Sequence, residues 1–277
     1  MTDIRRRRIR LEGLGLFCLE AGEGGRAMLL LHGRWGRAET WRELMLRYAG
    51  RYRIVAPDQR GHGLSDRPRS SYTAEELAGD AAALADALGL RELVAIGHSM
   101  GAQVAAQLAV ARPDLVRGLA LLDKSPEGSP PRPPLPPDEI RVDDPVTAAL
   151  RPPFDSWTAA REAISAWAES ETAIRYFMNG LREDDEGVRP LFDPYAIAAG
   201  LANNSSWWEL LPRIACPTMV ARARGGEAVS DEAFHRMARE IPAARAYELS
   251  LPDHNLHQAD PTEFYRCFDD FLAWLGD

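Results

Sequence analysis

The sequence is poor in three features that would each assign it to a familiar class of protein. It holds only three cysteines, Cys18, Cys216 and Cys267, and their odd number and wide spacing argue against a disulfide framework or a zinc site. No apolar segment approaches the length that spans a bilayer. Basic residues are not in excess either, because the net charge is −8, which disfavours nucleic acid and anionic membrane surfaces as partners. We therefore expect a cytoplasmic protein, monomeric or homodimeric, with no nucleic-acid or membrane partner.

One basic run contrasts with this acidic composition. Residues 5–8 are four arginines within "IRRRRIRLEG", where apolar residues bracket them. That pattern is more typical of a solvated edge strand than of a nucleic-acid-binding arm. A twin-arginine export signal would need an uninterrupted apolar stretch after the arginines, and Glu12 and Glu20 break it.

Short β-rich runs alternate with helical patterns over most of the chain. The run "AMLLLHG" (27–33) is continuously apolar, as expected for a strand that is covered on both faces. This alternation predicts an α/β fold with a doubly wound, mostly parallel, eight-stranded sheet. Besides the arginine-rich edge strand, the predicted strands are 15–22, 27–33, 52–58, 93–97, 116–123, 217–223 and 244–251. The predicted helices are 40–50, 77–89, 102–111 and 231–241, and a last one that starts at "DPTEF" (260–264).

The alternation stops after residue 124. Residues 126–137, "PEGSPPRPPLPP", hold seven prolines and cannot form a regular helix or an interior strand. From about 143 to 210 the pattern is helical and rich in bulky side chains. We expect residues 125–211 to form a helical lid over the strand ends, and residues 1–124 and 212–277 to form the core domain. Within the lid, "LREDDEG" (181–187) is expected to be a solvated turn and not a metal site, because nothing supplies the other ligands.

The stretch "LVAIGHSMGAQVAAQ" (93–107) carries the strongest chemical signal. An apolar strand ends at Gly97, Ser99 follows, and a helical pattern starts after Gly101. Glycines on both sides of the serine remove the Cβ clashes that a sharp strand-to-helix turn would create. Such a turn lifts the Ser99 hydroxyl off the backbone and aims the first helical amides at the space above it. We therefore predict that Ser99 is a nucleophile, not a serine that only caps the helix.

The stretch "LLLHGRWG" (29–36) supplies a second part of this predicted site. A strand that ends in His-Gly lets the backbone approach the turn at Ser99 closely. The amide of Arg34 can then join the amide of Met100 as an oxyanion hole, in which one donor is worth about 3 kcal/mol.

Four stretches in this order and spacing resemble the α/β-hydrolase superfamily, and the resemblance covers essentially the whole chain. They are "LHGRWG", "PDQRGHGLSDRP" (57–68), "GHSMG" and "DHNLHQADP" (253–261). The resemblance implies the α/β-hydrolase fold with an inserted helical cap, and an enzyme that uses no cofactor or metal. In this family "RGHGLS" shapes a loop, so His62 is a poor candidate for a catalytic base.

The resemblance also narrows the choice among six histidines. The base should lie on the loop after the last core strand, which leaves His254 and His257. Relatives usually carry Gly-His there, sometimes with a second histidine three residues later. This maps the base onto His254, with Asp253 in place of the glycine. His257 is then expected to support the loop or to hydrogen-bond outward.

The acid has two candidates. Family members commonly carry Gly-x-x-Asp after the seventh strand, and counted from Gly225 that position is Ala228, with Glu227 beside it. The other known location is the end of the sixth strand, where "LALLDKSP" supplies Asp123. Either carboxylate would fix the imidazole tautomer and stabilise the imidazolium. Asp123 is favoured, and Glu227 stays as the alternative.

Aromatic residues suggest the lining of a substrate pocket. We expect Trp35 and His98 to reach it from the core, and Trp157 and Trp207 to reach it from the lid. At helical spacing, most of the other lid aromatics must bury the lid against the core.

These features predict a serine hydrolase that acts on a small molecule. It would cleave an ester or lactone of a medium-sized, largely apolar compound through an acyl-enzyme intermediate. Carbon–carbon bond hydrolysis of a diketone-type substrate is an alternative within the same fold. A third possibility is a ligand-binding protein that keeps the hydrolase shell without its catalysis.

Overall fold

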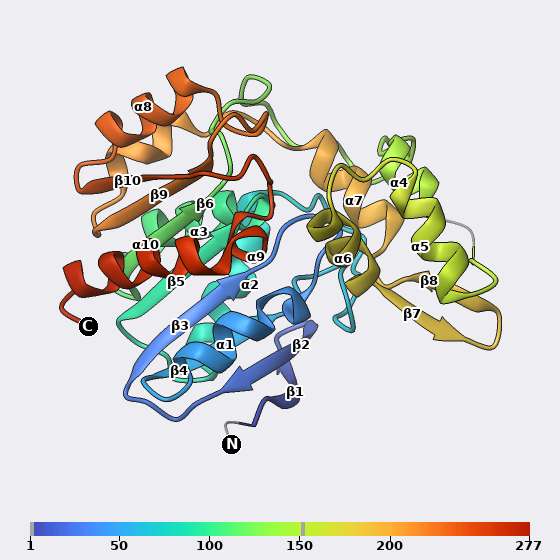
Figure 1. The fold of residues 1–277 in the computed structure, drawn as a ribbon, viewed down its shortest axis with the longest axis horizontal. Helices are drawn as coiled ribbons and strands as arrows, with labels where there is room; N and C mark the ends of the chain where they lie inside the picture. Colours follow the sequence, from blue (N-terminus) through green and yellow to red (C-terminus); the bar gives the residue numbers. More distant parts are fainter. Residues whose placement is uncertain (1–2, 151–152) are drawn as a thin grey trace.

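The computed structural model describes residues 3–150 and 153–277, and an eight-stranded sheet forms its centre (Figure 1). The strand order is β1-β2-β4-β3-β5-β6-β9-β10. β2 runs antiparallel to both β1 and β4, and the other neighbours are parallel. The predicted doubly wound, mostly parallel sheet is therefore confirmed. The strands are β1 (Arg5–Leu11), β2 (Leu14–Ala21), β3 (Arg26–Leu31), β4 (Tyr52–Pro57), β5 (Leu93–His98), β6 (Val116–Leu122), β9 (Thr218–Ala223) and β10 (Ala244–Leu249).

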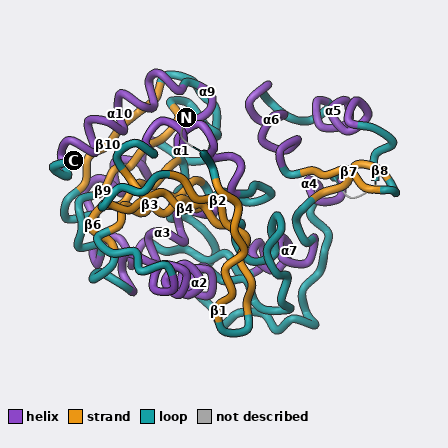
Figure 2. The backbone as a smooth tube through the Cα atoms, turned by 90° about the horizontal axis from the view of Figure 1, so that it is seen from below, coloured by secondary structure: helices purple, strands orange, loops and turns teal. Residues whose placement is uncertain are grey.

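Helices cover both faces of this sheet, as Figure 2 shows with the sheet seen nearly edge-on. Side chains alternate along each strand, so Met28 and Leu30 of β3 face one layer, while Leu29 and Leu31 face the other. This explains why the central strands are apolar throughout. One layer holds α1 (Arg42–Tyr48), α9 (Leu256–Ala259) and α10 (Pro261–Trp274), and the other holds α2 (Ala74–Ala87), α3 (Met100–Ala111) and α8 (Asp231–Glu240).

Polar caps fix where two of these helices begin. Thr73 Oγ1 accepts a hydrogen bond from the Glu76 amide at 3.2 Å at the start of α2. Asp260 accepts one from the Glu263 amide at 2.9 Å, and Pro261 occupies the first position of α10. Each such cap stabilises its helix by about 1 kcal/mol.

The arginine run lies on β1, at the edge of the sheet, with its side chains exposed to solvent. Arg5 pairs with Glu23 at 3.2 Å and Arg7 pairs with Glu20 at 3.0 Å. The run therefore forms the solvated edge strand that the sequence predicts.

Between β6 and β9 the chain forms a cap beyond the carboxyl ends of the parallel strands (Figure 1). The proline-rich stretch 130–137 contains no helix or strand. The cap helices are α4 (Pro145–Ala149), α5 (Trp157–Ser165), α6 (Glu171–Asn179) and α7 (Pro194–Ala202). Two short 3₁₀ helices lie outside them: η1 (Ala38–Trp41) is in the core, and η2 (Trp208–Arg213) follows the cap helices.

One expectation for this segment is corrected. Residues 181–187 are not simply a solvated turn, because β7 (Leu181–Asp184) pairs with β8 (Gly187–Pro190) in an antiparallel hairpin. The hairpin forms because Phe154 exchanges two backbone hydrogen bonds with Val188, at 2.7 and 2.8 Å, and Val188 is buried. Only the tip, around Asp185, is a turn.

The cap has a small hydrophobic cluster of its own, which includes Leu150, Ile164, Val188 and Ile197. The later part of the insertion packs differently, since Trp207 and its neighbours in η2 belong to the larger core cluster. In the described part of the chain, no helix combines the length and apolar character needed to cross a membrane. The same residues contain no cluster of three or more His, Cys, Asp or Glu side chains placed to hold a metal ion.

Candidate active site

Ser99 occupies a strained turn between β5 and α3. Its φ of 51° and ψ of −120° lie in a region that non-glycine residues rarely adopt. Flanking glycines permit the turn. A Cβ on Gly97 would lie 2.1 Å from the Gly101 carbonyl oxygen, and one on Gly101 would lie 2.1 Å from that of Leu31. The turn is also anchored to β6, because the Ser99 amide donates to the Leu122 carbonyl at 2.9 Å.

Asp123, directly after β6, contacts His254. Its Oδ2 lies 2.8 Å from His254 Nδ1, and its Oδ1 accepts a hydrogen bond from the Ala223 amide at 3.0 Å. The Asp123 side chain is 1% exposed, so water does not compete for these contacts. Its φ of 49° is a second strained conformation at this site.

Glu227, the other candidate acid, lies apart from this contact. It is exposed, and with Asp123 and His254 it lines an open surface hollow. Among the described residues no hydrogen bond joins Glu227 to His254. The structure therefore brings Asp123, and not Glu227, to the histidine.

Two neighbours hold the loop that carries His254. His98 Nε2 donates to the His254 carbonyl at 2.8 Å, and burial lowers the pKa of His98 well below its usual value, so the ring stays neutral. Asp253 accepts from the Asn255 amide at 2.8 Å and from the Ser170 hydroxyl at 2.5 Å. Because Ser170 is the N-cap of α6, this last contact connects the cap to the histidine loop.

Ser99 and His254 line the same cavity, which has a volume of about 330 Å³. That size lies at the lower end of the range for small-molecule sites. No hydrogen bond joins Ser99 Oγ to His254 within the described part of the chain, and such contacts often tighten only when substrate binds. The other lining residues are Arg34, Trp35, His98, Val146, Trp167, Ala168, Glu169, Ala173, Tyr176, Phe177 and Asn255.

The amides of Arg34 and Met100 are the predicted oxyanion donors, and Met100 is the first residue of α3, directly after Ser99. A Cβ on Gly33 would lie 3.1 Å from Ser99 Cβ, so the loop that follows β3 passes close to the serine. Tyr176 of the cap donates its hydroxyl to the Arg34 carbonyl at 3.1 Å and holds this loop in place. Trp35, with φ of 60°, is a third strained residue beside the cavity.

The predicted pocket residues divide into two groups. Trp35 and His98 line the Ser99 cavity, but Trp157 and Trp207 do not, and this expectation is corrected. Trp157 is 40% exposed because its Nε1 donates to Glu183 at 2.9 Å on the outer side of the cap. Trp207 is 3% exposed because η2 packs against the main core.

Two further histidines, His62 and His257, are buried and do not line the Ser99 cavity. His257 is buried and stacks on Trp41 with ring centroids 4.5 Å apart, and burial lowers its pKa to about 3. Neither of its ring nitrogens finds a partner among the described residues, so the expected outward hydrogen bond is not formed. His62 donates Nδ1–H to the Arg60 carbonyl at 3.0 Å, and burial lowers its pKa to about 4.

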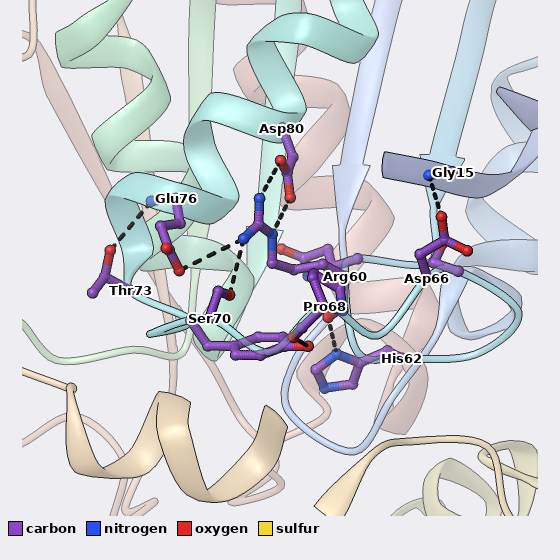
Figure 3. A network of polar contacts seen from close by, with 12 residues as sticks. Gly15, Arg60, His62, Asp66, Pro68, Ser70, Thr73, Glu76 and Asp80 are labelled. Carbon is purple, nitrogen blue, oxygen red and sulfur yellow. Dashed lines mark hydrogen bonds and ion pairs between the residues drawn. The ribbon is translucent and has the colours of Figure 1, made fainter. Parts of the chain in front are cut away.

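The loop that contains His62 is held by an ion-pair network, shown in Figure 3. Arg60 binds Asp80 of α2 through two contacts, at 2.5 and 2.7 Å, and donates to the Ser70 hydroxyl at 3.0 Å. Glu76 adds a longer ion pair at 3.6 Å. This loop therefore shapes the fold beside the site, as the sequence predicts for "RGHGLS".

Sequence reasoning missed several residues at the site. Trp167, Tyr176 and Phe177 line the cavity from the cap, and helical periodicity could not separate them from buried cap residues.

Comparison with known proteins extends over nearly the whole chain. A family model described as "Alpha/beta hydrolase family" matches residues 28–266. A 2-(acetamidomethylene)succinate hydrolase of Mesorhizobium japonicum is 27% identical over 96% of this chain and 94% of its own. A crystal structure of E-2-(acetamidomethylene)succinate hydrolase has a TM-score of 0.83 at 26% identity, covering 98% of this chain and all of that one (100%). An alpha/beta hydrolase from Novosphingobium aromaticivorans has a TM-score of 0.81 at 23% identity over 99% of each chain, which is a likeness of fold.

Proposed function

Because the chain belongs to the alpha/beta hydrolase family, we propose that it is a serine hydrolase in which Ser99, His254 and Asp123 form the catalytic triad. The 2.8 Å contact between Asp123 and His254, beside the cavity that contains Ser99, is the observation that carries this proposal. A carboxylate at Nδ1 keeps the other ring nitrogen free to accept a proton and stabilises the imidazolium that results.

In the proposed reaction, Ser99 Oγ attacks the substrate carbonyl while His254 Nε2 takes the hydroxyl proton. The amides of Arg34 and Met100 stabilise the oxyanion, and neither donates a hydrogen bond to the described part of the chain. His254 then gives the proton to the leaving group, and an acyl-enzyme remains. Water, deprotonated by the same histidine, attacks the acyl group and releases the acid together with free Ser99.

We propose an ester or lactone of a medium-sized compound as the substrate. The size of the cavity supports this, and so do the apolar side chains on its cap side, which include Val146, Trp167 and Phe177. The relative at 27% identity is named for a compound with an acetamido group, so amides belong in the same substrate tests.

A fluorophosphonate probe tests the nucleophile directly. We expect stoichiometric labelling of the wild-type protein and none of the Ser99→Ala variant, with Ser125→Ala as a matched control that is still labelled. Folded wild-type protein that stays unlabelled would favour the non-catalytic ligand-binding alternative.

A panel of esters, lactones, amides and diketones then tests the bond that is cleaved. Turnover of esters or lactones, lost in Ser99→Ala, is the expected result. Turnover confined to diketones would instead favour carbon–carbon bond hydrolysis by the same triad.

A further inference from the structure

The side chain of Arg34 lines the Ser99 cavity and lies 5.8 Å from the centre of the Trp35 ring, but among the described residues it forms no ion pair. Its Nε is buried and without a hydrogen bond among the described residues, and the only bond of its guanidinium there is a long one, 3.4 Å, to the Gly200 carbonyl. Burial lowers the pKa of Arg34 to about 10, so the group still carries its charge at neutral pH. A buried cation without a paired anion is costly, which suggests that its partner arrives with a ligand.

Behind Arg34 lies a small recess of about 20 Å³ that Arg34 shares with the larger cavity. Among the described residues, the polar side chains beside the arginine in this recess include Gln103, Asn203 and Asn204, and no Asp or Glu lines it. The Asn203 amide already donates to the Ser71 carbonyl at 2.8 Å, and the Gln103 amide to the Ser205 carbonyl at 3.4 Å. A volume of about 20 Å³ holds about one water and no carboxylate, so an anion would meet the guanidinium from the Ser99 cavity.

A second cation adds to the positive field. Lys124 follows Asp123 at the carboxyl end of β6, and burial together with the charge of Arg34 lowers its pKa to about 8. Within the described residues it forms no ion pair. The two cations therefore repel one another in the absence of a ligand.

Two carboxylates near the cavity do not cancel this charge. Asp144 raises the pKa of Arg34, but no ion pair joins the two side chains; Asp144 Oδ1 caps α4 through the Thr147 amide at 2.7 Å, and its Oδ2 is buried without a hydrogen bond among the described residues. Glu169 lines the cavity from the cap, where it is exposed and screened by solvent.

We propose that the Ser99 cavity accepts a substrate that carries a carboxylate, and that the guanidinium of Arg34 binds this carboxylate. This inference rests on the proposed function, and it narrows the substrate class to monoesters or monoamides of dicarboxylic acids, or lactones that carry an acid group. In this proposal the backbone amide of Arg34 binds the oxyanion of the reacting carbonyl, and the guanidinium of the same residue binds the substrate carboxylate. The length of the arginine side chain therefore sets the distance between the two groups of the substrate. The apolar cap residues then contact the leaving group.

Binding to the inactive Ser99→Ala variant tests the proposal without requiring turnover. The probes are matched pairs, the monomethyl and dimethyl esters of succinate, glutarate and adipate, and the measurement is titration calorimetry at pH 7. In at least one pair we expect the monoester anion to bind about 10- to 100-fold more tightly than the neutral diester, as for other charge-assisted bidentate contacts.

Variants of Arg34 in the same background make the test specific. Arg34→Met is expected to reduce the preference for the anion to about twofold or less. Arg34→Lys is expected to retain part of it, since lysine keeps the charge but lacks the two parallel N–H donors of a guanidinium. Arg182→Met, on the exposed face of the cap hairpin and away from the cavity, is the matched control and is expected to leave the preference in place. If Arg34→Met does not fold, the Arg34→Lys variant still tests the proposal, because its preference for the monoester over the diester should be smaller than that of the Ser99→Ala parent.

The proposal is overturned if no pair shows a preference for the anion, or if Arg34→Met weakens monoester and diester equally. Failure of fluorophosphonate labelling, in contrast, would overturn the serine hydrolase proposal and leave this binding result standing.

Discussion

The core and the cap meet at one cavity but contribute different things to it. The core side carries the polar contacts and the strained backbone, at Trp35, Ser99 and Asp123. The cap side contributes apolar side chains from a cluster of its own, together with Tyr176, whose hydroxyl bonds to the Arg34 carbonyl. Strained backbone persists where the surrounding structure over-determines it, and all three residues lie just after strands of the central sheet. The core therefore positions the residues of the proposed triad, and the cap supplies much of the apolar lining of the cavity.

The sharpest test of this division is the proposed triad acid. Asp123→Asn should lower kcat by about 10⁴-fold, because an amide in place of the carboxylate favours the wrong imidazole tautomer. Glu227→Gln, at the exposed alternative acid, should change kcat less than about threefold. Steady-state kinetics on an ester found in the panel provide the measurement. The reverse pattern would show that Glu227 is the acid.

Acid pH should lower the stability of the fold through buried histidines of the core, whereas residues 125–211 of the cap contain no histidine. In the folded chain the pKa of His62 is lowered to about 4 and that of His257 to about 3, whereas an unfolded histidine titrates near 6.5. Between these values the unfolded state binds protons that the folded state does not. The free energy of unfolding should therefore fall as the pH drops from about 6.5 towards 4, by up to about 1.4 kcal/mol per pH unit for each histidine.

Urea unfolding at pH 7, 6 and 5 measures this effect. His257→Gln should flatten the dependence, and replacement of the exposed His235 by Gln serves as the control. A stability that does not change over this range would contradict the burial of these rings.

Glycine-to-alanine substitutions should destabilise the protein at the turn around Ser99 but not on an exposed helix surface. Gly101→Ala should destabilise the fold by about 3 kcal/mol or more, because its Cβ would meet the Leu31 carbonyl oxygen at 2.1 Å and force the backbone to move. Gly79→Ala, on the exposed side of α2 with no atom in the way, should stabilise the protein by about 1 kcal/mol. Thermal denaturation of both variants tests the pair. Equal effects would mean that the turn is not tightly packed.

The smallest expected effect concerns the contact between the cap and the histidine loop. Ser170→Ala and Ser156→Ala each remove the N-cap of a cap helix, at a cost of about 1 kcal/mol. Only Ser170 also donates to Asp253, beside His254. Ser170→Ala should therefore lower kcat/KM about three- to tenfold, while Ser156→Ala should leave it nearly unchanged. If both variants are equally active, the cap does not position the histidine.

Local signals explain which parts were predictable. The periodicity of the strands, the glycines around Ser99 and the order of the four motifs each depend on neighbours within a few residues. They were sufficient to predict the sheet, the turn and the approach of Gly33 to it. The cap was less predictable because its hairpin depends on Phe154, more than 25 residues before its partner Val188. Which cap residues face the Ser99 cavity depends on how the whole insertion packs against the core. The expectation that Trp157 and Trp207 line this cavity was therefore wrong.

By itself, the sequence determined that an apolar strand ends in a glycine-flanked serine within an alternating α/β chain, because steric limits on the backbone act over a few bonds. Only the tertiary structure decided which carboxylate meets His254. Asp123 and Glu227 both follow strands that lie side by side in the sheet, and the choice depends on the path of a loop that comes more than a hundred residues after Asp123. It also decided that Arg34 has no paired anion among residues 3–150 and 153–277, since the absence of a partner depends on every segment that packs around it.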